Sequence, residues 1–339
     1  MERPRASHDL APDHAMTAPS VQGVRTAPPP AQQPGRGGGG RARRSGYRLA
    51  DLAGVGPPMM LFCLFIVVPM IVAFALSFVR WNGLGNPQWA GASNWAQFFR
   101  DPVAHTSLVV TLKVVGLSYV VQTPISIALG LFTAGRQRYR AVYAALFVLP
   151  LLISTAGIAL MWESFLDPNF GALTWLAKSW HLGFLQQNWL GDPTLTLYVV
   201  VGIIAWQFIP FHTLLYQVGR RQIPQVLYEA ATIDGASKAA MFWRLTLPQL
   251  RYTVVTSGIL MIVGSLTYFD IIYIMTDGGP GYSTRVLSLD MYNAAFGQQQ
   301  YGYASVLAVL LGVIGIAVAV GLVRFSGFAS MASQQEGAA

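Results

Sequence analysis

Six long windows without any Asp, Glu, Lys or Arg constrain this chain more than any other feature of its sequence. The windows are 52–79, 114–135, 141–162, 193–219, 252–269 and 291–323. An α-helix needs roughly 20 apolar residues to cross the hydrocarbon core of a bilayer, and each window can supply about that number. We therefore predict an all-α membrane protein with six transmembrane helices, near 52–79, 106–134, 141–162, 194–218, 251–276 and 302–323.

The composition also indicates that lipid, rather than water, surrounds most of this chain. Hydrophobic residues make up 53% of the chain and charged residues 11%, whereas soluble domains carry about 25% charged residues. The nine Trp and fourteen Tyr residues suit aromatic belts at the two membrane interfaces. The single cysteine, Cys63, excludes an intramolecular disulfide and a multi-cysteine metal site. We expect this chain to bind no metal and no cofactor of its own.

Basic residues are distributed unequally between the two sides of the predicted bundle. If both termini lie on one side, that side carries seventeen of the 22 Lys and Arg residues, and the other side carries four. Lys and Arg favour the cytoplasmic side of a membrane. We therefore expect a protein of the bacterial plasma membrane with both termini in the cytoplasm. We predict a disordered basic Pro/Gly-rich tail over 1–46, the membrane domain over 47–324 and a cytoplasmic tail over 325–339. This topology accounts for the high isoelectric point without a nucleic-acid partner.

The loop between the fourth and fifth predicted spans has the pattern of two short helices. Pro224 can occupy the first turn of a helix, where a missing N–H costs little. Asp234-Gly235 then predicts a turn, because glycine reaches positive φ without steric cost. A second helix is expected over 236–245, with Pro248 closing the unit. From its shape alone, this amphipathic unit could equally be a connector lying in the membrane interface.

The residues of this loop resemble a known family motif. Glu229-Ala230-Ala231, then Gly235, then Leu245-Thr246-Leu247-Pro248 is similar in spacing to the EAA loop of ATP-binding-cassette importer permeases, with Leu245 where Ile is usual. Two further segments, 267–280 and 91–102, resemble carbohydrate-uptake permeases of the maltose and glycerol-phosphate type. The resemblance implies a type I importer permease fold with cytoplasmic EAA coupling helices, without the large outer insert of the maltose permease.

The same resemblance implies partners and a role for each motif residue. The residues expected to couple this chain to an ATPase are Glu229, Ala230, Ala231, Gly235, Leu245 and Pro248. The chain has no phosphate-binding loop, so ATP and Mg are expected on a partner subunit and this chain is not expected to be an enzyme. The implied partners are a second homologous permease, two ATP-binding cassette subunits and an extracytoplasmic solute-binding protein or lipoprotein.

Polar and aromatic side chains within the spans mark a candidate path for a sugar. Hydrogen-bonding groups are costly in a membrane unless they face a pathway or a partner, and the resemblance places solute contacts on the fourth and fifth spans. The candidates are Ile204, Gln207, Phe208, Phe211, Gly264, Ser265, Tyr268 and Asp270. Ile204 is apolar where the maltose permease has an amide. Gln207 and Tyr268 could instead join helices, and Asp270 could instead pair with a neighbouring subunit.

Alternative functions remain open at this point. The aromatic-rich path favours a disaccharide or short oligosaccharide, but glycerol phosphate or a polyol is possible, as is an importer for another class of solute. An ion-coupled secondary transporter would require titratable relays in several spans and two internal repeats. The sequence has one clear intramembrane carboxylate, Asp270, and no evident repeat, which argues against that class.

Overall fold

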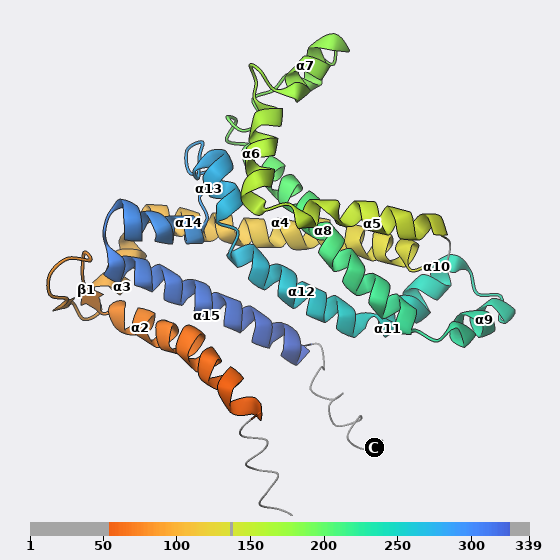
Figure 1. Cartoon of the computed structure of the whole chain (residues 1–339), viewed down its shortest axis with the longest axis horizontal. Helices are drawn as coiled ribbons and strands as arrows, with labels where there is room; N and C mark the ends of the chain where they lie inside the picture. The colour runs from red at the N-terminus through yellow and green to blue at the C-terminus, as the bar shows by residue number, and fades with distance from the viewer. Residues whose placement is uncertain (1–53, 136–137, 326–339) are drawn as a thin grey trace, which may run out of the picture. The chain divides into compact units, whose positions relative to one another are not determined.

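The computed structural model describes residues 54–135 and 138–325, and nearly all of them belong to one compact unit that begins at Met60. The predicted tails over 1–46 and 325–339 lie outside the described residues, apart from Phe325. Figure 1 shows that helices make up almost all of this unit.

Four uninterrupted helices are long and apolar enough to cross a membrane. They are Gly54–Leu76, which contains α2 (Val68–Leu76), α4 (Pro102–Thr133), α8 (Thr196–Gln222) and α15 (Tyr301–Phe325). Two further segments qualify as bent pairs, α5 (Arg138–Leu152) with α6 (Thr155–Leu166), and residues 238–249 with α12 (Arg251–Leu266). When each pair is counted as one span, the described residues contain up to six candidate spans, although residues 238–249 belong to the loop between the fourth and fifth predicted spans.

The third span differs from the single helix expected over 141–162, because α5 and α6 meet at 93°. Ser154 between them has an extended backbone, and its hydroxyl accepts a hydrogen bond from the Gly157 amide at 3.2 Å. A serine cap of this kind begins a new helix in a new direction. The charge-free window therefore predicted the length of the segment and not its break.

The fifth span also differs from the single helix expected over 251–276. The helix α12 ends at Leu266, and α13 (Asp270–Thr276) begins after a three-residue break. The Thr267 amide and hydroxyl both donate to the Gly264 carbonyl, at 3.0 and 2.8 Å, which closes the last turn of α12. Residues 267–276 therefore do not continue α12 as the single helix that the sequence pattern predicted.

The helices α4 and α8 pack against each other over much of their length. A Cβ atom added at Gly130 would lie 2.6 Å from the Tyr216 Cβ, so the two backbones approach closely there. The Gln217 amide donates to the Thr133 carbonyl at 2.9 Å, which satisfies one polar group of this buried interface. Pro210 lies inside α8 without ending it.

A small hairpin and a short helix connect the first two spans. Strands β1 (Val79–Arg80) and β2 (Gln88–Trp89) pair antiparallel, and α3 (Ser93–Arg100) follows. The buried Asn94 amide donates to the carbonyls of Ser77 and Val79, at 3.0 and 2.9 Å, and so holds α3 against the hairpin. Shorter helices complete the described chain: α7 (Ala172–Ser179), the 3₁₀ turn η2 (Gly183–Leu185), α14 (Leu287–Tyr292) and the π-helical turn η4 (Asn293–Gly297).

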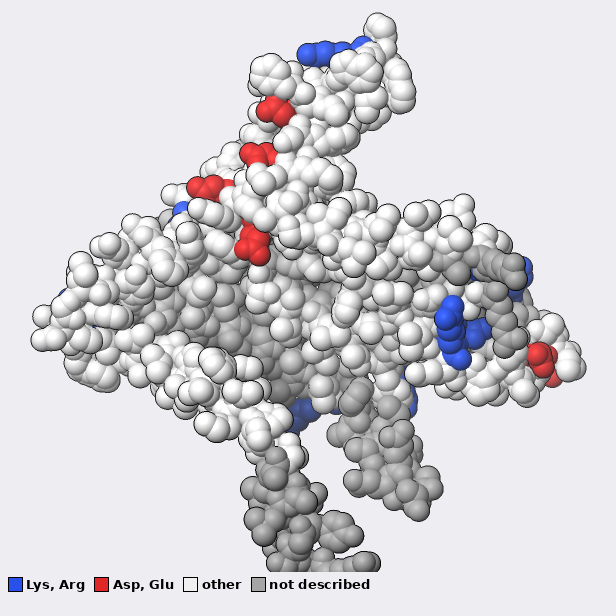
Figure 2. All heavy atoms as spheres, in the orientation of Figure 1, with Lys and Arg blue, Asp and Glu red and all other residues white. Residues whose placement is uncertain are grey.

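The charged side chains avoid the broad middle of the surface seen in Figure 2. In this view many Lys and Arg side chains lie toward the end that carries α10 (Lys238–Met241) and α11 (Leu247–Gln249), whereas most of the Asp and Glu side chains lie around α6 and α13. The uncharged surface between them is what helices need in order to face lipid.

The ion pair Arg285–Asp290 supports the connection between α13 and α14, and we expect its loss to destabilise the protein. The Arg285 guanidinium donates to one Asp290 carboxylate oxygen at 2.6 and 2.9 Å. Burial raises the pKa of Asp290, and Arg285 opposes that shift. Arg285→Met should lower the free energy of unfolding by about 2 kcal/mol at neutral pH, because a buried carboxylate loses its partner.

The pH dependence of this loss follows from the same shift. Without Arg285, the folded-state pKa of Asp290 rises further above its unfolded value, so the loss should shrink as the pH falls and Asp290 takes up a proton. Thermal unfolding of the purified protein in detergent from pH 7 to pH 4 measures both effects, with the exposed Arg100→Met as the control. Equal melting temperatures for Arg285→Met and the wild type at pH 7 would contradict the role assigned to this pair.

Candidate coupling loop and solute pathway

The predicted helix–turn–helix is present between α8 and α12. The helix α9 (Gln225–Ile233) ends at Asp234, and Gly235 makes the turn with φ of +73°. The second helical stretch begins after Ser237, whose hydroxyl accepts from the Ala240 amide at 3.2 Å. This stretch passes through α10 (Lys238–Met241), the π-helical η3 (Phe242–Thr246) and α11 (Leu247–Gln249). It is therefore longer than the expected 236–245, and Pro248 lies within α11 rather than after it.

The loop presents an apolar surface that nothing in the described chain covers. Ile233 is 86% exposed, and Val226 and Trp243 are also well exposed. A hollow of about 430 Å³ opens between the two helical stretches, lined in part by Leu227, Ala230, Ala231, Arg244 and Leu245. Contiguous exposed apolar residues of this kind mark an interaction surface.

The two helical stretches of the coupling loop are bonded to each other, and the first of them is also bonded to α8. The Tyr228 hydroxyl and the Thr246 hydroxyl lie 2.9 Å apart, which links the first helix to the second. The Arg220 guanidinium stacks 3.8 Å from the centre of the Tyr228 ring, which links α8 to α9. A force applied to α9 therefore reaches α8 through packed groups rather than through a loose connection.

The exposed Glu229 borders a basic hollow of about 730 Å³ at the end of α8. Arg140, Arg220 and Arg221 contribute to its lining. Glu229 is thus a carboxylate in a local field of positive charge, and of the six predicted coupling residues it alone carries a charge.

Three of the predicted pathway residues lie together within the spans. The buried Gln207 amide on α8 donates to the Thr155 hydroxyl at the start of α6, at 3.1 Å. At the next residue of α8, the Phe208 ring stacks on the Tyr268 ring with centroids 5.3 Å apart and an interplanar angle of 29°. The Tyr268 hydroxyl lies near Gln122 of α4 and Ser265 of α12. Two adjacent residues of α8 therefore contact the start of α6 and the break after α12, through amide, hydroxyl and aromatic groups.

Of the other predicted pathway residues, Ser265 borders this cluster, and Ile204, Phe211, Gly264 and Asp270 have other surroundings. Ile204 is fully buried in the apolar core, and the Ser265 hydroxyl donates to the Met261 carbonyl of its own helix at 2.7 Å. Phe211 is 38% exposed and packs edge-on against His212. Gly264 has open space where a Cβ would stand, and Asp270 is exposed in the first turn of α13.

Two neighbours of the cluster were not singled out as pathway residues from the sequence. Gln122 lies two residues before Pro124 in an apolar window, and it is fully buried near the Tyr268 hydroxyl. Thr155 lies in an apolar window, where only the polar pair Ser154-Thr155 could have drawn attention to it. His212 bonds Ser257 at 2.8 Å, as expected of a structural histidine.

The family of this chain is shown by comparison with known proteins. The model of the family described as binding-protein-dependent transport system inner membrane component matches residues 123–327. This range covers more than half of the chain and contains the coupling loop and, apart from Gln122, the cluster around Gln207. The chain belongs to this family. The permease is thus a multi-pass membrane subunit of the ATP-binding-cassette importer class.

Relatives of the permease match it over most of its length. The trehalose/maltose transport system permease protein MalF of Thermococcus litoralis is 31% identical over 259 residues, 76% of this chain and 87% of that protein. The diacetylchitobiose uptake system permease protein NgcF of Streptomyces coelicolor is 28% identical over 323 residues, 89% of each chain. The multiple sugar-binding transport system permease protein MsmF of Streptococcus mutans is 30% identical over 76% of this chain and 88% of its own.

A solved structure confirms the fold of the permease. A chain of a bacterial ABC transporter that imports the acidic polysaccharide alginate matches with a TM-score of 0.72 and 22% identity, over 83% of this chain and 96% of that chain. The type I importer permease fold expected from the EAA resemblance is therefore confirmed.

Proposed function

We propose that this permease carries a neutral disaccharide or short oligosaccharide into the cytoplasm by alternating access. The observation that carries the proposal is the meeting of the Gln207 amide with the stacked Phe208–Tyr268 pair inside the spans. Sugars present hydroxyls that pair with amides and faces that pack on aromatic rings. The sugar-uptake names of the relatives support the same solute class.

The energy for this transport comes from separate subunits. ATP and Mg bind to two ATPase subunits that hold the coupling loop, and this chain performs no chemistry itself. Both termini and the coupling loop face the cytoplasm, and an extracytoplasmic binding protein delivers the sugar. A second homologous permease completes the path. The exposed apolar residues of the loop support the ATPase contact, and the basic residues beside them support a cytoplasmic location.

Uptake by the reconstituted complex tests this function. The permease is purified with the subunits encoded beside it and placed in liposomes that contain ATP. We expect uptake of one member of an array of di- and oligosaccharides that depends on ATP and on the binding protein. The array includes glycerol phosphate and polyols as the competing solutes. Uptake of only these solutes, or uptake without an ATPase, would contradict the proposal.

Gln207→Leu is expected to weaken sugar transport without changing assembly. Leucine keeps the approximate volume of glutamine but removes both hydrogen-bonding groups, so a sugar hydroxyl loses its partner in the path. We expect the half-saturating concentration or the preference between two sugars to change about tenfold.

The initial rate of uptake measures this effect, with Gln186→Leu, an exposed amide outside the spans, as the matched control. Size-exclusion chromatography checks that both variants assemble. Unchanged uptake kinetics in the Gln207 variant would remove this residue from the solute path.

A further inference from the structure

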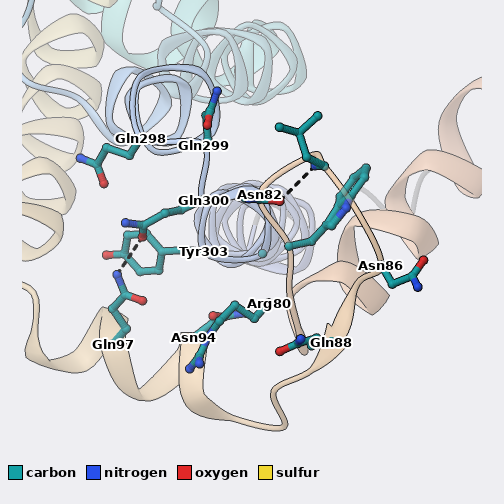
Figure 3. A pocket seen from close by; sticks show the side chains of 13 residues that line it. Arg80, Asn82, Asn86, Gln88, Asn94, Gln97, Gln298, Gln299, Gln300 and Tyr303 are labelled. Carbon is teal, nitrogen blue, oxygen red and sulfur yellow. Dashed lines mark hydrogen bonds between the residues drawn. The ribbon is translucent and has the colours of Figure 1, made fainter.

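A pocket of about 610 Å³ lies outside the solute pathway, where the chain leaves the first span and enters the last. Figure 3 shows that its side chains come from two separate parts of the chain, the hairpin with α3 and the segment 298–303. Pockets of 300–1,000 Å³ are roughly the size that holds small ligands. This volume is therefore sufficient for a disaccharide.

Amide side chains dominate this pocket. Eight of its thirteen lining residues are Asn or Gln: Asn82, Asn86, Gln88, Asn94, Gln97, Gln298, Gln299 and Gln300. Each amide offers donors and acceptors together, which is also the pattern that a sugar hydroxyl presents. Arg80 is the one charged residue among those that line it, and no lining residue in the described chain is acidic. The pocket is therefore suited to a neutral polyhydroxylated ligand rather than to an ion.

Part of the pocket is held rigid by its own hydrogen bonds. The Gln97 amide donates to the Gln300 side-chain oxygen at 3.2 Å, which joins the two parts of the wall (Figure 3). The Trp81 indole donates to the Gly85 carbonyl at 3.2 Å, and its ring lies 5.5 Å from that of Tyr301. A fixed aromatic wall lowers the entropic cost of binding a ligand.

Other amides in the pocket remain free to bind. Asn86, Gln88 and Gln298 are exposed, and their side chains bond no other described residue. The pocket thus combines a fixed wall with unused donors and acceptors.

The pocket lies at the opposite end of α4 from the coupling loop. Tyr303, which lines the pocket, donates to Asp101 at the start of α4 with a distance of 2.7 Å. Leu131, near the end of α4, lines the basic hollow that Glu229 borders. A helix of this length, 32 residues, spans roughly 48 Å. If the coupling loop faces the cytoplasm, the pocket faces the outside.

We propose that this amide-rich pocket is an outer binding site for a neutral di- or oligosaccharide, separate from the cluster around Gln207. The proposal rests on the proposed sugar-uptake function and adds a second site for the same solute class. The site holds a sugar at the outer face through the amides of the hairpin and of segment 298–300, with Trp81 as its aromatic wall.

Saturation-transfer NMR tests this site on the assembled transporter in lipid nanodiscs without its binding protein. The probes are maltose, trehalose and diacetylchitobiose, and we expect magnetisation transfer to at least one of them. The triple variant Asn86→Ala, Gln88→Ala, Gln298→Ala should weaken that binding about tenfold, because several hydrogen bonds are lost together. The matched control Gln186→Ala should bind as the wild type does.

Gln207→Leu separates this site from the path through the spans. The signal should persist in this variant, because none of the residues that line the pocket belongs to the cluster around Gln207. The proposal is overturned if the triple variant keeps the full signal or if Gln207→Leu alone removes it. It is also overturned if the triple variant changes only the affinity for the binding protein. A further contradicting result would be a probe sugar that the transporter takes up but that receives no magnetisation from it. Uptake by the same complex in liposomes that contain ATP, with the binding protein added, tests the proposed function independently, since a bound probe with no carbohydrate uptake would count against the function alone.

Discussion

Glu229→Lys is expected to stop ATP-driven uptake while leaving the permease inserted in the membrane. Glu229 is exposed on α9, beside Arg140, Arg220 and Arg221, and offers a carboxylate to a partner. Reversing its charge removes the carboxylate from the proposed contact with an ATPase and adds a positive charge beside these three arginines, and like charges placed together cost several kcal/mol. We expect uptake to fall by more than about a hundredfold.

Two measurements distinguish a lost contact from a misfolded loop. Co-purification of the ATPase with the permease should weaken in Glu229→Lys, and the melting temperature of the permease alone should change little, because the side chain is exposed. Glu229→Gln keeps the size of the side chain without adding repulsion, so it should retain part of the uptake. Wild-type uptake by the Lys variant would remove Glu229 from the coupling contact.

Gly302→Val is expected to destabilise the permease more than any other single change considered for its fold. A Cβ at Gly302 would overlap the Val79 carbonyl oxygen and would lie 2.8 Å from the Asn94 amide nitrogen. This crowding acts on backbone rather than on a flexible side chain, and it also disturbs the Asn94 hydrogen bonds that hold α3. We expect a loss of about 3 to 5 kcal/mol in the free energy of unfolding.

The same helix provides the matched control for this change. A Cβ at Gly312 meets no atom within 4 Å, so Gly312→Val adds the same side chain to α15 without the overlap. Thermal unfolding in detergent and the yield of membrane-inserted protein compare the two variants. Equal melting temperatures would contradict the close approach of α15 to the hairpin.

The sequence was sufficient to predict the spans and the coupling loop, because both depend on local chemistry. A charge-free window of sufficient length can only be stable in lipid as a helix. Gly235 in turn marks the place where the backbone must reach positive φ. The two bends were not predicted, since a single hydroxyl such as that of Ser154 can redirect a helix without changing its hydropathy.

The solute site was only partly predictable. Gln207, Phe208 and Tyr268 are polar or aromatic residues in apolar windows. The family resemblance indicated which of the polar and aromatic residues in these windows to expect in the solute path. Thr155 and Gln122 join them only through packing between helices that are far apart in sequence. The outer pocket was missed for a similar reason, because its amides lie in connecting segments, where polar residues are ordinary.

The tight contact of Gly130 with Tyr216 limits where this permease can flex. Since the α4 and α8 backbones are in contact there, neither helix can slide or tilt alone without a steric clash. The two helices are therefore expected to move together as one rigid unit. Bending is expected instead at three breaks between helices. One is at Leu250, where the two helices meet at 66°, and the others are beside Ser154 and beside Thr267. The breaks beside Ser154 and Thr267 adjoin the groups that surround Gln207 and Tyr268. A joint movement of α4 and α8 would therefore change the shape of the proposed sugar site.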